Sequence, residues 1–427
     1  MKYINPRKTS FPIILILIVL IIITSCQRGV DWTSFRGMDG RGASPARINP
    51  PIGIKWKLKL QLENNPATVF NPPVIRGNTV YFGAPDGNFY ALNINSGYMR
   101  WVFKTGGIIN SIPHIDKEKV YFGSNDGKLY AVYIDDGKQA WSFKADSTIQ
   151  STVVVYRDMV VFSTNGGSVY FLSTDGKLIY RLPNPVWYYD AFQIQDNVLY
   201  FAPGPMPTPH RLAAFDVSEK DYLWILDVRV FGATWYSFPA IKGKFLLMST
   251  CRPLYNFWRL NYYALESRTG KIIWNYSDIS VWGEDNNIKP GVLFRKNIRL
   301  LDYLAPAVWK NIVIYTSGDS VVRAFNVKTG GLIWRRRFDR PTSSAPTVAG
   351  GKVYFGIKGG TGNPKKEGDF QRDKKQPPLL VCLNARNGKK LWEMELDGEI
   401  LSAPVIAGKW IIFGTDKNYF YVLEELF

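Results

Sequence analysis

Residues 120–141 read VYFGSNDGKLYAVYIDDGKQAW, and residues 80–101 read VYFGAPDGNFYALNINSGYMRW. Both stretches have 22 residues, open with Val-Tyr-Phe-Gly and close on a tryptophan. Each combines alternating apolar residues, which favour strands, with an Asp-Gly pair, which tolerates positive φ and favours a two-residue hairpin turn. One such unit predicts three antiparallel strands, and its recurrence predicts a repeat architecture.

A further short strand precedes each unit. It occurs in eight copies, and six of them carry proline at the third position. Proline cannot donate to a β-ladder and is therefore found on edge strands, such as the innermost strand of a propeller blade. The eight copies are NPPVI at 71, SIPHI at 111, STVVV at 151, DAFQI at 190, SFPAI at 237, LAPAV at 304, SAPTV at 344 and SAPVI at 402.

The closing tryptophans stand at a fixed distance from small residues. An alanine, or Cys382 in one unit, lies ten residues before most of them, and a glycine usually lies four residues before. This spacing predicts that each unit docks one large ring against a small residue, with Tyr180 in place of tryptophan in the third unit. The expected docking tryptophans are Trp56, Trp101, Trp141, Trp224, Trp274, Trp334 and Trp392.

The last unit, residues 411–423, has no fourth strand after it, whereas the strand 52–60 carries Trp56 and has no unit before it. We expect this N-terminal strand to complete the last blade, because a closed ring leaves only short edges exposed. The sequence therefore predicts an all-β fold over residues 51–427. It is an eight-bladed β-propeller of four-stranded antiparallel blades.

The first 25 residues have the features of an export signal. Lys2, Arg7 and Lys8 precede an apolar run from Phe11 to Ile23, which is shorter than the roughly 20 residues that a spanning helix needs. The run ends in Ile-Thr-Ser before Cys26, which resembles a bacterial lipobox. We expect residues 1–25 to be a lipoprotein signal peptide and Cys26 to carry the lipid anchor. Residues 26–50 then form a tether leading into the propeller, and the expected location is the periplasmic face of the outer membrane.

The chain is strongly basic, with a formal net charge of +18 and a pI of about 9.6. Removing residues 1–25 takes away three positive charges and no negative ones, which leaves about +15. The excess either keeps the β-surface soluble or attracts an anionic surface such as lipid, cell wall or an acidic protein. An exported chain is not expected to meet nucleic acid.

The pattern Ala-x-x-x-x-x-Gly-x-x-x-Trp resembles the tryptophan-docking repeat of the pyrroloquinoline-quinone (PQQ) propellers. Residues 31–44, DWTSFRGMDGRGAS, resemble the start of lipid-anchored members of that superfamily. Among these the chain is most similar to the BamB family. This resemblance implies a monomeric, non-enzymatic scaffold without cofactor or metal, which binds the barrel-forming subunit of outer-membrane protein assembly.

Two other functions stay open. A PQQ-dependent oxidoreductase would place PQQ and calcium at the channel mouth, but the chain has no Cys-Cys pair, no haem-attachment motif and no evident calcium-ligating cluster. A lipoprotein that binds cell wall or glycans is the second alternative.

Few residues offer chemistry. The two histidines, His114 in an inner strand and His210 in a proline-rich loop, do not form the clusters that metal sites or catalytic triads need. Cys382 occupies a docking-alanine position, and Cys251 ends a strand two blades away. We expect two buried thiols that are too far apart for a disulfide.

Departures from the repeat are the better candidates for function. Insertions at 252–261, 280–299 and 358–378 are expected to be loops, which commonly carry binding residues. Aromatic and arginine side chains near the first of these are typical of protein interfaces. The candidate partner surface is Trp235, Tyr236, Tyr255, Phe257, Trp258 and Arg259.

Overall fold

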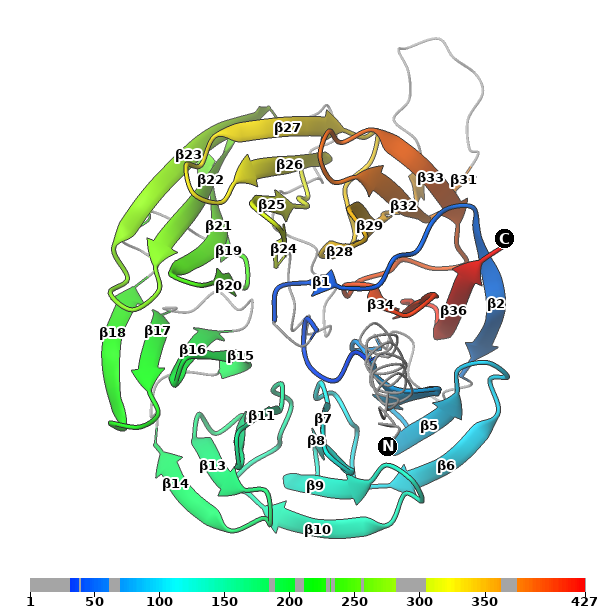
Figure 1. The fold of residues 1–427 in the computed structure, drawn as a ribbon, viewed down its shortest axis with the longest axis vertical. Coiled ribbons are helices and arrows are strands. Elements are labelled where there is room, and N and C mark those ends of the chain that lie inside the picture. The colour runs from blue at the N-terminus through cyan, green and yellow to red at the C-terminus, as the bar shows by residue number, and fades with distance from the viewer. Residues whose placement is uncertain are drawn as a thin grey trace, which may run out of the picture.

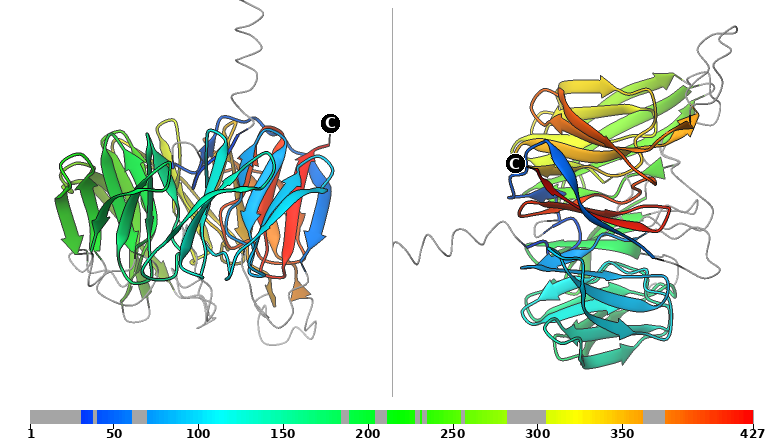
Figure 2. Two further views of the ribbon diagram at one scale, coloured as in Figure 1. Left: turned by 90° about the horizontal axis from the view of Figure 1, so that it is seen from below. Right: turned by 90° about the vertical axis from the view of Figure 1, so that its right-hand side faces the viewer.

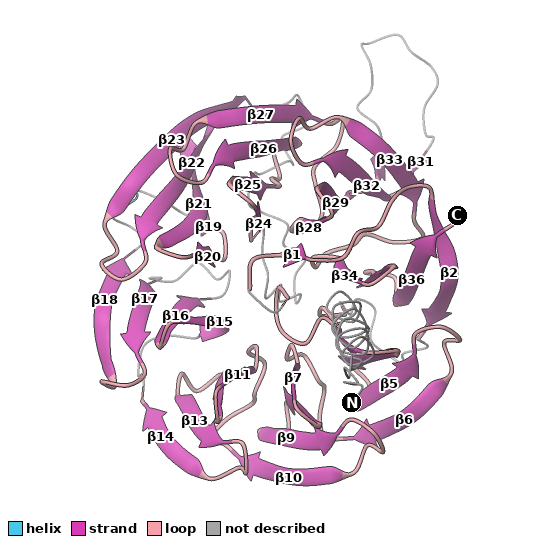
Figure 3. Cartoon of the chain, viewed as in Figure 1, coloured by secondary structure: helices cyan, strands magenta, loops and turns pink. Residues whose placement is uncertain are grey.

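The computed structural model describes residues 31–37, 40–60, 70–183, 189–203, 211–227, 231, 235–254, 257–281, 305–361 and 375–426. Strands β2–β29 and β32–β36 form eight blades around a central channel, as Figure 1 shows, while β1 adds to the seventh blade and β30 pairs with β31. Figure 3 shows that these strands are joined by loops and turns. Within the described ranges, no helix has the length and hydrophobicity needed to cross a bilayer.

Each of the first four blades is a sheet of four consecutive antiparallel strands, ordered from the channel outward. The strands are β3 (Val74–Arg76), β4 (Thr79–Gly83), β5 (Asn88–Asn93), β6 (Met99–Lys104), β7 (His114–Asp116), β8 (Lys119–Gly123), β9 (Lys128–Tyr133), β10 (Gln139–Lys144), β11 (Val154–Tyr156), β12 (Met159–Ser163), β13 (Val169–Ser173), β14 (Leu178–Leu182), β15 (Tyr189–Gln195), β16 (Val198–Pro203), β17 (Arg211–Asp216) and β18 (Asp221–Asp227).

The last four blades keep this order but carry additions. Their strands are β19 (Trp235–Tyr236), β20 (Ala240–Lys242), β21 (Phe245–Leu254), β22 (Phe257–Glu266), β23 (Ile272–Val281), β24 (Ala307–Trp309), β25 (Ile312–Tyr315), β26 (Val321–Asn326), β27 (Leu332–Arg337), β28 (Thr347–Ala349), β29 (Lys352–Ile357), β30 (Gly360–Thr361), β31 (Lys375–Gln376), β32 (Leu379–Asn384), β33 (Lys390–Glu395), β34 (Val405–Ala407), β35 (Trp410–Gly414) and β36 (Tyr419–Glu425).

The N-terminal strand closes the ring. Strand β2 (Ile52–Lys59) pairs antiparallel with β36, placing Ile54 opposite Leu423 and Trp56 opposite Val422. The last blade is therefore β34–β35–β36–β2. The predicted eight-bladed, all-β propeller and its closure are confirmed.

The inner strands are shorter than the sequence predicted. Strand β7 begins at His114, directly after Pro113, and the other proline-bearing copies likewise begin after their proline. Proline has no N–H to donate to the ladder, so pairing starts one residue later. A serine fixes the chain just before: the Ser111 hydroxyl accepts from the Gly123 N–H at 2.8 Å and donates to the Gly123 carbonyl at 2.9 Å.

The docking tryptophans join neighbouring blades. Trp101 lies opposite Ala91 in its own blade, while its indole N–H donates to the Ile134 carbonyl of the next blade at 2.8 Å. Its ring covers Gly137, whose φ is 73°, and a Cβ there would come within 2.7 Å of the ring. The same bond, at 2.8–3.0 Å, joins Trp56, Trp141, Trp224, Trp274 and Trp334 to the carbonyls of Ile94, Thr174, Ser267, Val327 and Ala385.

The junction between the third and fourth blades uses different residues at both positions. Tyr180 replaces the tryptophan, and Lys220, with a φ of 56°, takes the turn position that glycine holds elsewhere. The Lys220 ammonium lies 5.4 Å from the centre of the Tyr180 ring, which is within cation–π range. At this junction, the lysine side chain at the glycine position is thus matched by tyrosine, whose ring is smaller than that of tryptophan.

The segment before β2 lies across one mouth of the channel, as the dark blue trace in Figure 1 shows. Trp32 bridges to Ile75 in the first blade, and the Thr33 carbonyl accepts from Ile115 in the second. Farther along, β1 (Ala43–Ser44) pairs in parallel with the inner strand β28 of the seventh blade. The described residues of the expected tether, 31–37 and 40–50, are thus packed against the propeller.

Arg36 holds this segment in place. Its side chain is only 2% exposed, and its guanidinium donates to the carbonyls of Ala305 at 3.0 Å, Pro306 at 2.6 Å and Pro346 at 3.3 Å. Gly42, at a φ of 63°, lies against the guanidinium, and a Cβ there would come within 2.2 Å of it. Glycine at position 42 therefore leaves the space that the Arg36 guanidinium occupies.

The disc has two different faces. The chain starts at one of them, where the Asp31 carboxylate accepts from Gly77 in the β3–β4 turn at 2.8 Å. We call this the N-terminal face. It carries the turns between the first and second strands of each blade and, in the first seven blades, the turns between the third and fourth strands. Figure 2 shows the dark blue start of the chain at this face and β30 and β31, in orange, projecting from the opposite face.

Candidate functional site

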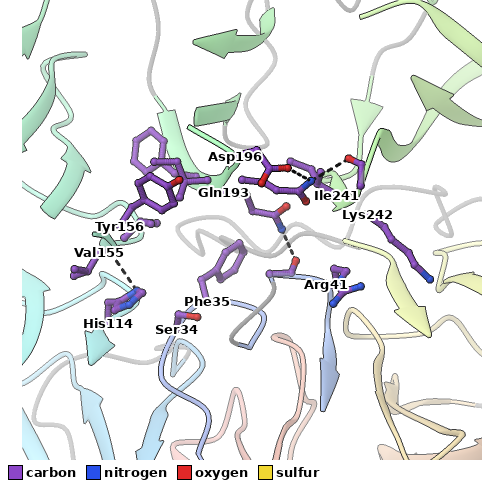
Figure 4. Close-up of a pocket in the computed structure, with 16 residues that line it drawn as sticks. Ser34, Phe35, Arg41, His114, Val155, Tyr156, Gln193, Asp196, Ile241 and Lys242 are labelled. Carbon is purple, nitrogen blue, oxygen red and sulfur yellow. Dashed lines mark hydrogen bonds between the residues drawn. The ribbon is translucent and has the colours of Figure 1, made fainter. Parts of the chain in front are cut away.

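A cavity of about 480 Å³ opens between the inner strands of the second to fifth blades. It lies beside the N-terminal segment, which contributes Ser34, Phe35, Gly40 and Arg41 to its wall. Figure 4 shows His114, Tyr156, Gln193, Asp196 and Lys242 around it. Its walls mix apolar and polar side chains, as ligand pockets commonly do.

His114 lies at one side of this cavity. Its Nδ1 accepts a long hydrogen bond, 3.4 Å, from the Val155 N–H. Burial, followed by the positive charge of Arg76, lowers the pKa of His114 to about 4. The imidazole is therefore neutral at pH 7 and serves as a structural hydrogen-bonding group.

The opposite side of the cavity is basic. Burial, and then the charges of Arg41 and Lys328, lower the pKa of Lys242. The Gln193 amide donates to the Gly40 carbonyl, and its buried Oε1 has no hydrogen-bond partner among the described residues. These groups could hold a small polar or anionic molecule, but no nucleophile with an adjacent base stands among the described lining residues.

The residues present do not fit PQQ with calcium. Calcium needs six to eight oxygen ligands, and among the described lining residues Asp196 supplies the one carboxylate. No group of three or more histidine, cysteine, aspartate or glutamate side chains gathers anywhere in the described chain. Arg36 and its segment also lie across this mouth of the channel. We therefore derive no chemistry through that cofactor.

The candidate partner residues lie in the enlarged fifth blade. Trp235 and Tyr236 form β19, which pairs with β21 opposite Cys251 and Thr250. Phe257, Trp258 and Arg259 begin β22. Tyr255 lies outside the described residues. The structure thus brings five of the six predicted residues onto one sheet.

The interpretation of residues 252–261 as a loop was wrong. Strands β21, β22 and β23 have ten residues each, whereas β4, β5 and β6 of the first blade have five or six. Arg252 pairs with Arg259, and Pro253 pairs with Trp258. The inserted residues lengthen the ladder instead of leaving it, because two runs of equal length can continue pairing in register. The additional paired residues of β21 and β22 lie at the face opposite the N-terminal face.

Several other predicted features are only partly described. Residues 282–299 and 362–374 of the other two insertions, and His210, lie outside the described residues, as do residues 1–25 and Cys26. The strands β30 and β31 pair within the third insertion. Cys251 and Cys382 are both buried thiols in different core clusters, as predicted, and burial raises the pKa of each to about 12.

A buried ion-pair cluster between the fifth and sixth blades was not predicted. Arg323 forms a two-pronged pair with Asp319, at 2.7 and 3.1 Å, and a further bond of 2.8 Å to Asp278 on β23. A groove of about 460 Å³ lies beside it, and Arg335 and Arg337 line its edge. In the sequence, the one indication of this pair is the four-residue separation of Asp319 and Arg323. Exposed ion pairs commonly have the same separation, so it does not predict a buried pair.

Eight four-stranded blades joined by docking tryptophans define this chain as a β-propeller of the PQQ-like repeat class. The family described as "Outer membrane protein assembly factor BamB" matches residues 53–142, 101–277, 263–363 and 318–426, and the chain belongs to that family. A BamB of Kangiella koreensis is 34% identical over 55 residues, which cover 13% of this chain and 14% of that protein.

Solved structures share the fold. BamB from Moraxella catarrhalis matches with a TM-score of 0.57 and 14% identity, covering 87% of this chain and 99% of that one. The quinohemoprotein alcohol dehydrogenase from Comamonas testosteroni matches with a TM-score of 0.66 and 14% identity, covering 95% and 82%. An assembly factor and an enzyme thus share this architecture, so the fold alone does not choose between their functions.

Proposed function

We propose that this protein is a lipid-anchored, periplasm-facing binding scaffold in the assembly of outer-membrane β-barrel proteins, and that it is not an enzyme. Membership of the BamB family across residues 53–426 is the observation that carries this proposal. The donor set at the channel mouth supports it, because a calcium-dependent quinone site would need more oxygen ligands than the described lining supplies.

The partner surface is the enlarged fifth blade. A ladder that extends beyond its neighbours presents a rigid edge, and rigid elements position binding residues more accurately than loops do. Strands β19, β21 and β22 carry Trp235, Tyr236, Phe257, Trp258 and Arg259 there. Tryptophan, tyrosine and arginine dominate the energetics of many protein interfaces. The partner is the barrel-forming subunit of the assembly machinery.

The anchor belongs to the same proposal. Residues 1–25 act as the signal peptide, and Cys26 carries lipid that holds a monomeric propeller at the periplasmic side of the outer membrane. The segment from Asp31 onward fixes the chain to the propeller immediately after this anchor.

Gene deletion and complementation test the role. Quantitative mass spectrometry of outer membranes should show fewer β-barrel proteins in the deletion strain and recovery with the wild-type gene. A Cys26→Ala gene should restore less, because the unanchored protein is diluted away from the membrane. Unchanged amounts of β-barrel proteins in the deletion strain would overturn the proposal.

A further inference from the structure

Basic residues gather on one half of the N-terminal face. The turns of the fifth, sixth and seventh blades on this face, with the strand residue on each side, contain ten basic residues and one carboxylate, Glu266. The basic residues are Lys242, Lys244, Arg268, Lys271, Lys310, Lys328, Lys352, Arg386, Lys389 and Lys390. We call this set the basic half-face.

The corresponding turns of the second, third and fourth blades have the opposite balance. They contain six basic residues and ten carboxylates. The two halves of one flat face therefore differ in sign, although the turns are equivalent in the repeat. A need for solubility alone would not separate the charges in this way, whereas a surface that meets an anionic partner on one side would.

Most of these cations are available to a partner. Eight of the ten are exposed, and Lys242 and Lys352 are half-buried. Within the described residues, carboxylates pair with two of them: Asp216 lies 3.7 Å from Arg268, and Glu393 lies 2.9 Å from Lys390. The single turn carboxylate, Glu266, accepts backbone N–H groups of its own turn.

Apolar side chains border the basic half-face. Ile272, Ile273, Ile333 and Leu391 begin the outer strands next to the basic turns and are exposed by 53, 38, 42 and 41%. The half-buried Trp309 lies between the cations of Lys310 and Arg386, at 5.0 and 5.7 Å from its ring. Cations with an apolar rim are the composition of protein surfaces that rest in the headgroup region of a bilayer.

The chain leaves the propeller on this same face. Asp31 is bonded to the β3–β4 turn, and the apolar run Phe11–Ile23 precedes it in sequence. Cys26 lies five residues before Asp31, so an extended chain places the two at most about 17 Å apart. This step rests on the lipid anchor proposed above, whereas the distribution of charge does not.

We propose that the basic half-face docks onto the anionic headgroups of a lipid bilayer. The lipid anchor and the cations then act together, since one lipid signal alone binds reversibly and a basic patch strengthens the attachment. The acidic half tilts away from the bilayer, and the enlarged fifth blade points its extended ladder away from the membrane, toward the periplasm.

Vesicle flotation tests this docking without the lipid anchor. Every strand of the eight blades lies within residues 52–426, so a chain that starts at residue 27 keeps the whole propeller. This chain should float with phosphatidylcholine–phosphatidylglycerol vesicles and much less with phosphatidylcholine alone. The difference should disappear at high salt, because the attraction is electrostatic.

Charge reversals locate the surface. A variant with Lys244→Glu, Lys271→Glu, Lys328→Glu and Lys389→Glu should bind anionic vesicles about tenfold more weakly or worse. A matched control reverses four exposed lysines at the opposite face, Lys59, Lys104, Lys144 and Lys417, with the same change in net charge. The control should keep its binding to within about threefold.

The outcomes are distinct. Equal loss in both variants would mean that only net charge matters and would overturn the docking surface. Equal flotation of the wild-type chain with neutral and anionic vesicles would also overturn it, as would no flotation with either, which leaves an acidic protein or the cell wall as the partner. None of these results depends on β-barrel assembly, so this inference and the proposed function fail separately.

Discussion

The Trp56 indole N–H donates to the Ile94 carbonyl at 2.8 Å, and its ring lies over Gly97. Trp56 belongs to the last blade through β2, whereas Ile94 and Gly97 belong to the first. The ring also stacks on Phe420, with 6.2 Å between centroids. One side chain therefore joins the two ends of the propeller, in the same way that Trp101, Trp141, Trp224, Trp274 and Trp334 join consecutive blades.

Trp56→Ala should weaken the whole propeller. It removes a large ring from the closing junction, and such truncations cost about 3–5 kcal/mol in the free energy of unfolding. Trp56→Phe keeps an aromatic ring but loses the N–H donor, and should cost about 1 kcal/mol from the hydrogen bond alone. Urea unfolding followed by tryptophan fluorescence measures both. Equal stability of Trp56→Ala and wild type would show that this junction does not close the ring.

Arg36→Met should destabilise the propeller by about 2–4 kcal/mol. The substitution leaves carbonyls of Ala305, Pro306 and Pro346 without the guanidinium that now bonds them in a buried place. Arg47→Met is the matched control, because Arg47 is exposed in the same segment. Thermal unfolding of the two variants provides the comparison, and a similar effect in both would show that Arg36 does not anchor the segment across the channel.

His114 should make the protein less stable in mild acid. Its pKa is about 4 in the folded chain and about 6.5 in the unfolded chain, so between these values the unfolded state binds the extra proton. The contribution of His114 to the free energy of unfolding is fully present above pH 6.5. It falls by up to about 3 kcal/mol as the pH drops toward 4.

His114→Asn isolates this contribution, because an amide oxygen can still accept from Val155 but does not titrate in this range. Protonation of carboxylates with lowered pKa values, such as Asp146 and Asp397, also destabilises the folded protein in acid. This effect is the same in the wild type and in the His114→Asn variant. The free energy of unfolding should therefore fall less in the variant between pH 7 and pH 4.5. Parallel pH profiles would contradict a buried neutral His114.

Asp319→Asn should cost about 3–5 kcal/mol of stability, because it leaves the buried Arg323 with Asp278 as its remaining carboxylate partner among the described residues. Glu393→Gln breaks the solvent-exposed pair with Lys390 and should change stability by less than about 1 kcal/mol. Denaturant unfolding of both variants measures the difference. Matching midpoints would mean that the cluster between the fifth and sixth blades is well solvated.

The repeat was predictable because its signals are local. Turn glycines such as Gly137 need a positive φ, and most docking tryptophans or the small residues paired with them keep a fixed spacing, so the number of blades and the closure by Trp56 follow from the repeat pattern. The prediction from the sequence was wrong at a position where one repeat differs from the others. Residues 252–261 look like a loop by composition, yet Arg252 and Arg259 continue a ladder, because pairing partners are not encoded locally.

The candidate sites depend on contacts between distant segments, which sequence spacing does not reveal. Arg36 meets Pro306 across 270 positions, and nothing in the pattern RGMDGRG indicates which carbonyls it reaches. The separation of basic and acidic turns also becomes visible only when the blades are placed around the ring. The net charge was evident from the sequence, but its arrangement was not.

A pull-down of the tagged, lipidated protein from mildly solubilised membranes, with mass spectrometry of the recovered proteins, tests the scaffold role most directly. The account predicts recovery of the barrel-forming subunit of outer-membrane assembly. Replacing residues 252–259 with Asn-Gly joins the paired residues Cys251 and Leu260 by a two-residue turn, and this variant should fold but lose that subunit. Absence of the subunit from the wild-type pull-down, under conditions that preserve the assembly complex, would contradict the account.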